Sequence, residues 1–116
     1  MPWLVACAAA RPNVVEPGAA PGLELWNDTA GETVCAVRAA PAGGDPEAPD
    51  LLLPDQVLPP GGRARFSELA GAVDLRIEDC NGDRLLEHRG LEVPAGGVLV
   101  VLRTRRPGLR PPPPVE

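Results

Sequence analysis

Three cysteines are the side chains with the widest chemical scope in this sequence, since thiols form disulfides, bind metal ions and accept covalent groups. Cys35 lies in the expected strand Thr33–Ala39, and Cys80 lies two positions after the alternating segment Val73–Glu78. Both positions are near the ends of expected strands, so we expect a Cys35–Cys80 disulfide that strengthens a small core. The alternative is a pair of reduced, buried cysteines. Zinc is not expected, because the spacing is wrong and the chain has a single histidine.

Candidate catalytic nucleophiles are few. Ser67 is the only serine and His88 is the only histidine of the sequence. Ser67 is not flanked by the glycines of a nucleophile elbow. Glu78 and Asp79 are adjacent in an expected strand and so point to opposite faces. We therefore predict that the chain is not an enzyme and has no catalytic residues. The rival hypothesis is an enzyme that uses a Ser67–His88 pair or an Asp/Glu pair.

A second group of reactive side chains is an acidic loop. It contains four carboxylates in and around proline-rich segments: Asp45, Glu47, Asp50 and Asp55. Carboxylates can hold a hard cation, but these follow no calcium-loop spacing. We predict no metal and no cofactor, and we expect these four residues to form a loop that binds a partner. A cation-binding module is the alternative.

The elements that must position these residues are short strands. Val73, Leu75 and Ile77 alternate with charged residues, and Asn81-Gly82 favours a type I′ hairpin turn. Val98–Leu102 is apolar on both faces, which is typical of a central strand. About seven such segments, with no helical period, predict an all-β fold: a small antiparallel β-sandwich with one inter-strand disulfide, covering residues 22–102.

The N-terminal segment predicts a membrane tether. Leu4-Val5-Ala6-Cys7 resembles the lipobox of bacterial lipoproteins, and this resemblance implies a diacylglycerol group on Cys7. Few residues precede it, so we interpret residues 1–21 as a truncated lipoprotein signal followed by a Pro/Ala tether. This interpretation requires a start upstream of Met1; the alternative is an accidental match in an Ala-rich N-terminus with a free thiol. Residues 103–116 are rich in Arg and Pro and are predicted to be a disordered tail.

A further pattern joins the two strand cysteines. The chain resembles small secreted or lipid-anchored bacterial β-sandwich proteins of unknown function in about half of its length. The matching residues are Asn27, Thr29, Thr33-Val34-Cys35-Ala36-Val37, Leu58-Pro59-Pro60-Gly61, Gly71-Ala72-Val73-Asp74-Leu75-Arg76 and Glu78-Asp79-Cys80-Asn81-Gly82. The resemblance implies the same fold and an extracytoplasmic location.

Charge and composition narrow the function further. Residues 22–102 carry a charge balance of −8 and residues 103–116 one of +3, within a net charge of −5. The acidic body disfavours nucleic-acid binding, and no segment is apolar enough for a transmembrane helix. We predict a non-enzymatic, monomeric module of the bacterial envelope, in the periplasm or at the outer membrane. It would be lipid-anchored through Cys7 and have a structural or protein-binding role. The alternative is a secreted inhibitor or accessory protein of an envelope hydrolase.

Overall fold

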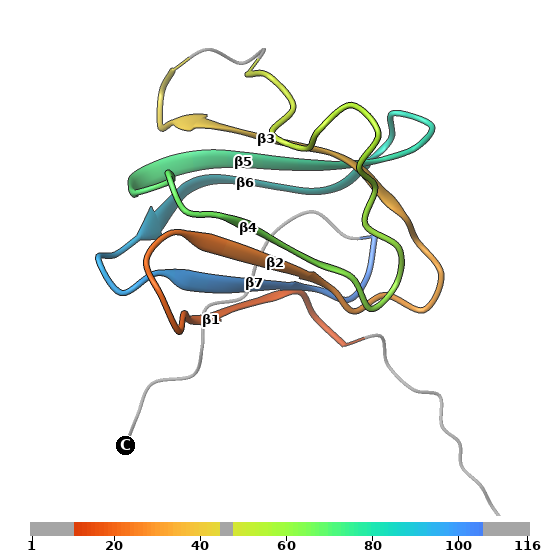
Figure 1. The fold of residues 1–116 in the computed structure, drawn as a ribbon, viewed down its shortest axis with the longest axis horizontal. Helices are drawn as coiled ribbons and strands as arrows, with labels where there is room; N and C mark the ends of the chain where they lie inside the picture. Colours follow the sequence, from red (N-terminus) through yellow and green to blue (C-terminus); the bar gives the residue numbers. More distant parts are fainter. Residues whose placement is uncertain (1–10, 45–47, 106–116) are drawn as a thin grey trace, which may run out of the picture.

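Two β-sheets packed face to face make up the molecule (Figure 1). The computed structural model describes residues 11–44 and 48–105. Its strands are β1 (Val14–Pro17), β2 (Leu23–Asn27), β3 (Val34–Pro41), β4 (Arg63–Phe66), β5 (Gly71–Asp79), β6 (Arg84–Val93) and β7 (Val98–Leu102). The four-stranded sheet has the order β1-β7-β2-β4, and the three-stranded sheet has the order β3-β5-β6. The predicted seven-stranded β-sandwich is therefore confirmed, and the described residues include no helix long and apolar enough to cross a membrane.

The core lies between the sheets and is built from the residues that alternate along each strand. In β5, Val73, Leu75 and Ile77 are buried, whereas the charged residues between them lie on the outer face. Aliphatic side chains dominate this core, with Phe66 of β4 as its aromatic member. β7 is central in the four-stranded sheet, as its apolar pattern predicts. Burial of these side chains supplies the main stabilisation.

Three elements differ from the sequence-based expectation. β1 lies inside the segment expected to be a tether, because Val14–Pro17 pairs with β7 and its Val15 packs against the core. β2 and β7 pair in parallel, so the four-stranded sheet is mixed rather than purely antiparallel. The apolar run 51–53 is not a strand.

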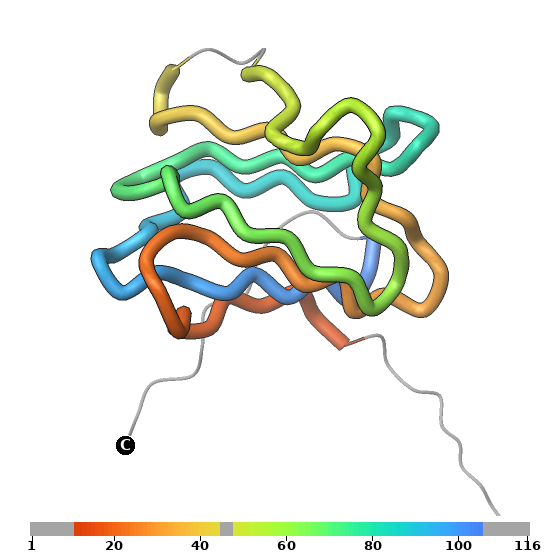
Figure 2. The backbone as a smooth tube through the Cα atoms, viewed as in Figure 1, coloured from red at the N-terminus to blue at the C-terminus, as the bar shows by residue number. Residues whose placement is uncertain are grey.

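The segment that contains this run covers the edge of β3 instead. Asp50 forms a bridge with Arg38, and Leu58 forms a bridge with Val34. Figure 2 shows the chain after β3 folding back and then passing from one sheet to the other. Its last residues reach β2, where the amide of Gly61 donates to the carbonyl of Asn27 at 2.6 Å. The segment thus protects one sheet edge and joins the two sheets.

The β5–β6 hairpin forms where Asn81-Gly82 predicts it, but the predicted turn type is wrong. Gly82 has φ of 84°, and no non-glycine residue in the described part of the chain has positive φ, so Asn81 does not adopt the conformation that a type I′ turn requires. The amide of Gly82 donates to the carbonyl of Asp79, and the amide of Asp79 donates to the carbonyl of Asp83. This pattern is that of a three-residue hairpin loop with glycine at the left-handed position. Asp79 explains the choice, because its Oδ1 accepts from the amides of Asn81 and Asp83 at 2.9 Å each.

The strands of both sheets lie roughly along one axis, which gives the sandwich two distinct ends (Figure 1). At the end that we call the disulfide end, β5 and β7 terminate, β3 and β6 begin, and the described chain starts and stops at Arg11 and Arg105. The opposite end carries the turns at residues 18–22, 41–44, 67–70 and 94–97. In Figure 1 the disulfide end is on the right.

Candidate functional site

The disulfide joins the start of β3 to the end of β5, the two strand ends that the sequence predicted. Cys35 lies at an irregularity near the start of β3, and Cys80 directly follows β5. The two Cα atoms are 4.9 Å apart, and the bond spans 45 positions of the sequence. The Cys35–Cys80 prediction is therefore confirmed, and the bond staples neighbouring strands of the three-stranded sheet.

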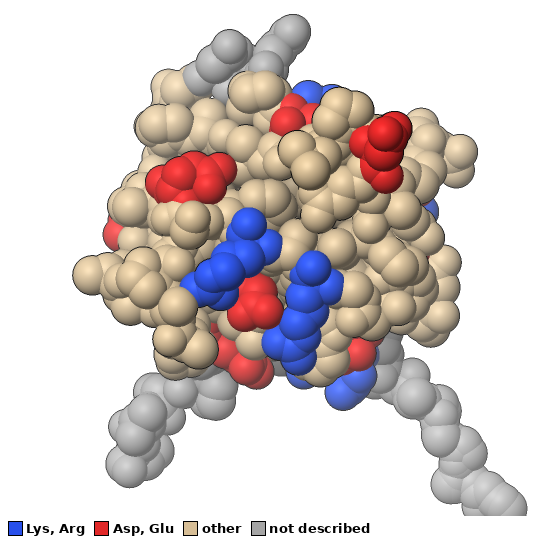
Figure 3. Space-filling model, viewed as in Figure 1, with Lys and Arg blue, Asp and Glu red and all other residues tan. Residues whose placement is uncertain are grey.

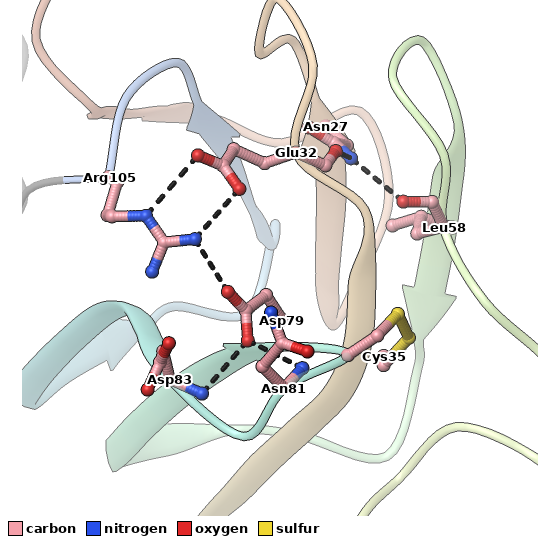
Figure 4. The surroundings of a disulfide bond; sticks show 9 residues. Asn27, Glu32, Cys35, Leu58, Asp79, Asn81, Asp83 and Arg105 are labelled. Carbon is pink, nitrogen blue, oxygen red and sulfur yellow. Dashed lines mark hydrogen bonds and ion pairs between the residues drawn. A yellow bond between two sulfur atoms is a disulfide. The ribbon is translucent and has the colours of Figure 1, made fainter.

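A buried carboxylate next to the disulfide holds the chain after β7 (Figure 4). The side chain of Asp79 is 7% exposed, and its Oδ2 accepts from Arg105 Nη2 at 2.5 Å. The same guanidinium donates to both carboxylate oxygens of Glu32, at 2.9 and 3.3 Å. The hydrogen bond from Arg105, followed by those from the amides of Asp83 and Asn81, lowers the pKa of Asp79 against the opposing effect of burial. The two carboxylates raise the pKa of Arg105 in turn.

Asn27 forms a second polar network at this end, buried between the sheets. Its Nδ2 donates to the carbonyls of Glu32 and Leu58 at 2.8 Å each. Its Oδ1 accepts from the amide and the hydroxyl of Thr29, at 3.2 and 2.8 Å. Every hydrogen-bonding atom of this fully buried amide is paired, which offsets the cost of burying it.

The two ends of the described chain are fastened together by Asn13. Its Oδ1 accepts from the amides of Arg103 and Thr104 at 2.6 and 2.9 Å, and its Nδ2 donates to the carbonyl of Thr104 at 3.0 Å. Asp28 adds ion pairs to Arg11 and Arg103, at 3.2 and 3.4 Å. Residues 103–105 of the predicted tail are therefore part of the domain, whereas residues 106–116 lie outside the described residues.

A cavity of about 360 Å³ opens on the outer face of the three-stranded sheet. Each strand contributes charged side chains: Arg38 from β3, Asp74 and Arg76 from β5, and Glu87 and Arg89 from β6. The remaining lining is Ala40, Gly43, Gly44, Ala48 and Leu75. Three positive and two negative groups give the lining a balance of +1 on a chain whose net charge is −5. We call this site the arginine cavity.

Asp74 fixes the shape of the arginine cavity at the opposite end of the sandwich. Its Oδ2 accepts from the amide of Gly43 at 3.1 Å, and its Oδ1 accepts from the amide of Gly90 at 2.9 Å. These hydrogen bonds, with that from Gly43 the larger influence, lower the pKa of Asp74. Gly90 has φ of 73° and lies where β6 contains an extra residue relative to β5. One carboxylate thus ties the loop after β3 to the bulge in β6.

The outer face of the four-stranded sheet carries a smaller charged group. Glu24 of β2 lies between Arg63 and Arg65 of β4, with ion-pair distances of 3.5 Å to each. Figure 3 shows a red side chain between two blue ones over these strands. The guanidinium of Arg63 also lies 4.5 Å from the centre of the Trp26 ring. These contacts pair the charges of this face with one another.

Of the four residues predicted to form a partner-binding loop, the structure describes Asp50 and Asp55. Asp50 caps backbone instead: its Oδ1 accepts from the amides of Val37 and Leu52 at 2.9 and 3.0 Å. Asp55 is exposed in a separate turn. Asp45 and Glu47 lie outside the described residues, and so does Cys7. In residues 11–44 and 48–105, no group of three or more His, Cys, Asp or Glu side chains could hold a metal ion.

Ser67 and His88, the pair that an enzyme would have used, belong to different sheets. Ser67 is exposed directly after β4, whereas His88 is half-buried in β6 opposite Leu75. No hydrogen bond joins their side chains in the described structure, and neither lines the arginine cavity.

Sequence reasoning did not find the arginine cavity or the role of Arg105. The alternation of β5 places Arg76 on the outer face, so this one residue was accessible from the pattern. The pairing of Arg38 with Arg76 depends on the register of β3 against β5, which no local pattern specifies. Arg105 was assigned to a tail because its partners, Asp79 and Glu32, are distant in sequence.

Fold and site together define a disulfide-linked, two-sheet β-sandwich with a cavity on the outer face of one sheet. No protein-family model, curated protein or solved structure significantly matches this chain.

Proposed function

We propose that this chain is a non-enzymatic, extracytoplasmic binding module of a bacterial envelope, anchored to lipid through Cys7. The observation that carries the proposal is the Cys35–Cys80 disulfide, because such bonds persist mainly in oxidising compartments outside the cytoplasm. The lipobox-like Leu4–Cys7 supplies the anchor. The resemblance of the motif residues to secreted and lipid-anchored sandwiches supports the same location.

The position of Arg11 gives this module an orientation. Arg11 lies at the disulfide end, where it pairs with Asp28, and Cys7 precedes it by four positions. Four residues span at most about 15 Å when fully extended. A lipid on Cys7 would therefore hold the disulfide end close to the membrane and direct the opposite end, with the rim of the arginine cavity, away from it.

Binding rather than catalysis is the role that these side chains favour. The polar groups of the disulfide end are hydrogen-bonded to one another, whereas the outer face of the three-stranded sheet offers a hollow with charged walls. Ser67 follows β4 of one sheet and His88 lies in β6 of the other, and no hydrogen bond joins their side chains in the described structure. We propose a monomer that presents this face to a partner in the envelope.

Mass spectrometry of the chain isolated from its native cells, without reduction, tests the proposal. We expect a peptide pair linked through Cys35 and Cys80 and a diacylglyceryl adduct on Cys7. Rapid alkylation in intact cells provides the control for oxidation after lysis. Alkylated Cys35 and Cys80 would contradict the location, and an unmodified Cys7 in the same sample would contradict the anchor.

A further inference from the structure

We propose that the arginine cavity binds a monocarboxylate, with Arg76 and Arg89 donating to the carboxylate of the ligand. The inference rests on the geometry of the cavity alone and holds whether or not Cys7 carries a lipid. Without a ligand, the charged side chains of this face would serve only as cross-strand ion pairs. The proposal instead assigns them a class of ligand.

Both guanidinium groups retain donors for a ligand. Arg76 approaches Glu78 at 3.6 Å and Glu87 at 4.0 Å, and Arg89 approaches Glu87 at 3.8 Å. These distances exceed those of good N–H···O hydrogen bonds. Within the described part of the chain, neither Arg76 nor Arg89 makes a closer polar contact through its side chain. Each planar guanidinium can therefore still form the paired hydrogen bonds that carboxylates accept.

Arg38 has a different part in the cavity, because a backbone carbonyl holds its side chain. Its Nη1 donates to the carbonyl of Ala48 at 3.0 Å, and its Nε lies 3.5 Å from Glu78. The side chain of Arg38 is thus held in place on the β3 side of the cavity. Glu78, which Arg38 and Arg76 share, cannot neutralise both.

The remaining lining selects the kind of anion. Asp74 and Glu87 would repel a second negative charge, and Asp74 is ionised because two backbone amides donate to it. Ala40 and Ala48 offer apolar contact to a small aliphatic group, whereas the side chain of Leu75 belongs to the core. A volume of about 360 Å³ lies at the small end of the range for ligand sites. These features favour an organic acid of charge −1 over inorganic phosphate.

Such a group has two sources, a free organic acid and the C-terminal carboxylate of a peptide. Amide and arginine side-chain NMR spectra of the full oxidised chain, titrated with four probes, distinguish them. We expect saturable shifts at Gly43 and Gly90 and at the Nε–H signals of Arg76 and Arg89 with propionate and with N-acetylalanine. N-acetylalaninamide and phosphate should produce no saturable shifts at these positions.

The comparison between the two acids then assigns the source. Tighter binding of N-acetylalanine assigns a peptide C-terminus, and equal binding assigns a free acid; both support the site. Absence of saturation with both acids overturns the proposal. Identical shifts with the acid and its amide also overturn it, because the carboxylate would then have no role.

Matched variants locate the interaction. Arg76→Gln should weaken carboxylate binding by about tenfold or more, as loss of charge-assisted hydrogen bonds implies. Arg89→Gln removes a side chain that is 77% exposed, so it tests the site without threatening the fold. Arg65→Gln, on the outer face of the other sheet, is the control and should bind as the unaltered chain does. Unchanged affinity in both Arg76→Gln and Arg89→Gln would refute the assignment.

Discussion

The disulfide end and the arginine cavity use charged and polar residues in opposite ways. At the disulfide end, Asn27, Asp79 and Arg105 each make several hydrogen bonds, and Asn27 and Asp79 are buried. In the arginine cavity, Arg76 and Arg89 have only long contacts with acidic neighbours and face a hollow.

The difference shows why residue type alone does not reveal a binding site. Eight of the residues that carry the sequence resemblance lie at the disulfide end: Asn27, Thr29, Cys35, Leu58, Gly61, Asp79, Cys80 and Gly82. Their polar contacts are with backbone, with each other and, for Asp79, with Arg105, so their role in this fold is architectural. A ligand is best sought where donors are unfilled, and here that is the outer face of the three-stranded sheet.

Removal of the disulfide should have the largest effect on this comparison. The Cys35→Ser/Cys80→Ser variant loses the constraint that a bond across 45 positions places on the unfolded chain. We expect the free energy of unfolding to fall by about 4 kcal/mol in the chain-entropy model, measured by urea denaturation. Reduction of the unaltered chain with dithiothreitol is the control and should give a similar loss. If neither treatment changed the free energy of unfolding, the disulfide would make no contribution to the stability of this end.

The buried amide comes next. Asn27→Ala leaves the carbonyls of Glu32 and Leu58 without their donor and Thr29 without its acceptor. Unpaired buried polar groups predict a loss of roughly 3 kcal/mol in the same urea measurement. Asn27→Asp, which keeps the size but removes the donor, should also destabilise the fold. A variant Asn27→Asp as stable as the unaltered chain would show that these carbonyls are paired in another way.

Acid should act on the disulfide end through Asp79. The pKa of Asp79 is lowered in the folded chain, first by Arg105, so its stabilising contribution is present above the ordinary pKa and is lost as the pH falls through the lowered value. We expect the Tm to decrease as the pH is lowered below about 4. In Arg105→Gln this decrease should be smaller, because the main cause of the shift is gone. The control Arg65→Gln should retain the full decrease, and identical profiles for both variants would contradict this role of Arg105.

The smallest effect is expected for Arg76. Its two ion pairs, at 3.6 and 4.0 Å on a partly exposed sheet face, are of a kind that contributes little. Arg76→Gln should therefore change the free energy of unfolding by less than about 1 kcal/mol, far less than Asn27→Ala. A loss as large as that of Asn27→Ala would place Arg76 among the structural residues and remove the contrast between the two regions.

The sequence allowed the strands, the sandwich and the disulfide to be predicted, because each depends on local patterns. The strict alternation of β5 and the apolar run of β7 specify which faces are buried, and hairpin residues place Cys80 at a strand end. β1 was missed because Val14–Pro17 is short, and its place was set by pairing with β7, more than 80 positions away in sequence.

The acidic loop illustrates the limit for the site. Asp50 looked available for a partner, but its carboxylate caps two backbone amides, one of them on β3. The arginine cavity depends on the register of three strands, and two extra residues in β6 shift that register. A one-residue change in pairing would move Arg76 or Glu87 to other neighbours. Such a site becomes visible only after the sheet is assembled.

The clasp that Asn13 makes on Arg103 and Thr104 also determines how the domain would respond to force. Tension applied between Arg11 and Arg105 would act at one end of the β1–β7 pair and open its hydrogen bonds one after another, a weak mechanical geometry. Tension between Arg11 and a partner on the opposite end would run along the strands and load many hydrogen bonds in shear at once. A module anchored at one end and bound to a partner at the other is therefore loaded in its stronger direction. Even if the sheets separated, the Cys35–Cys80 bond would limit how far the chain between these two residues could extend.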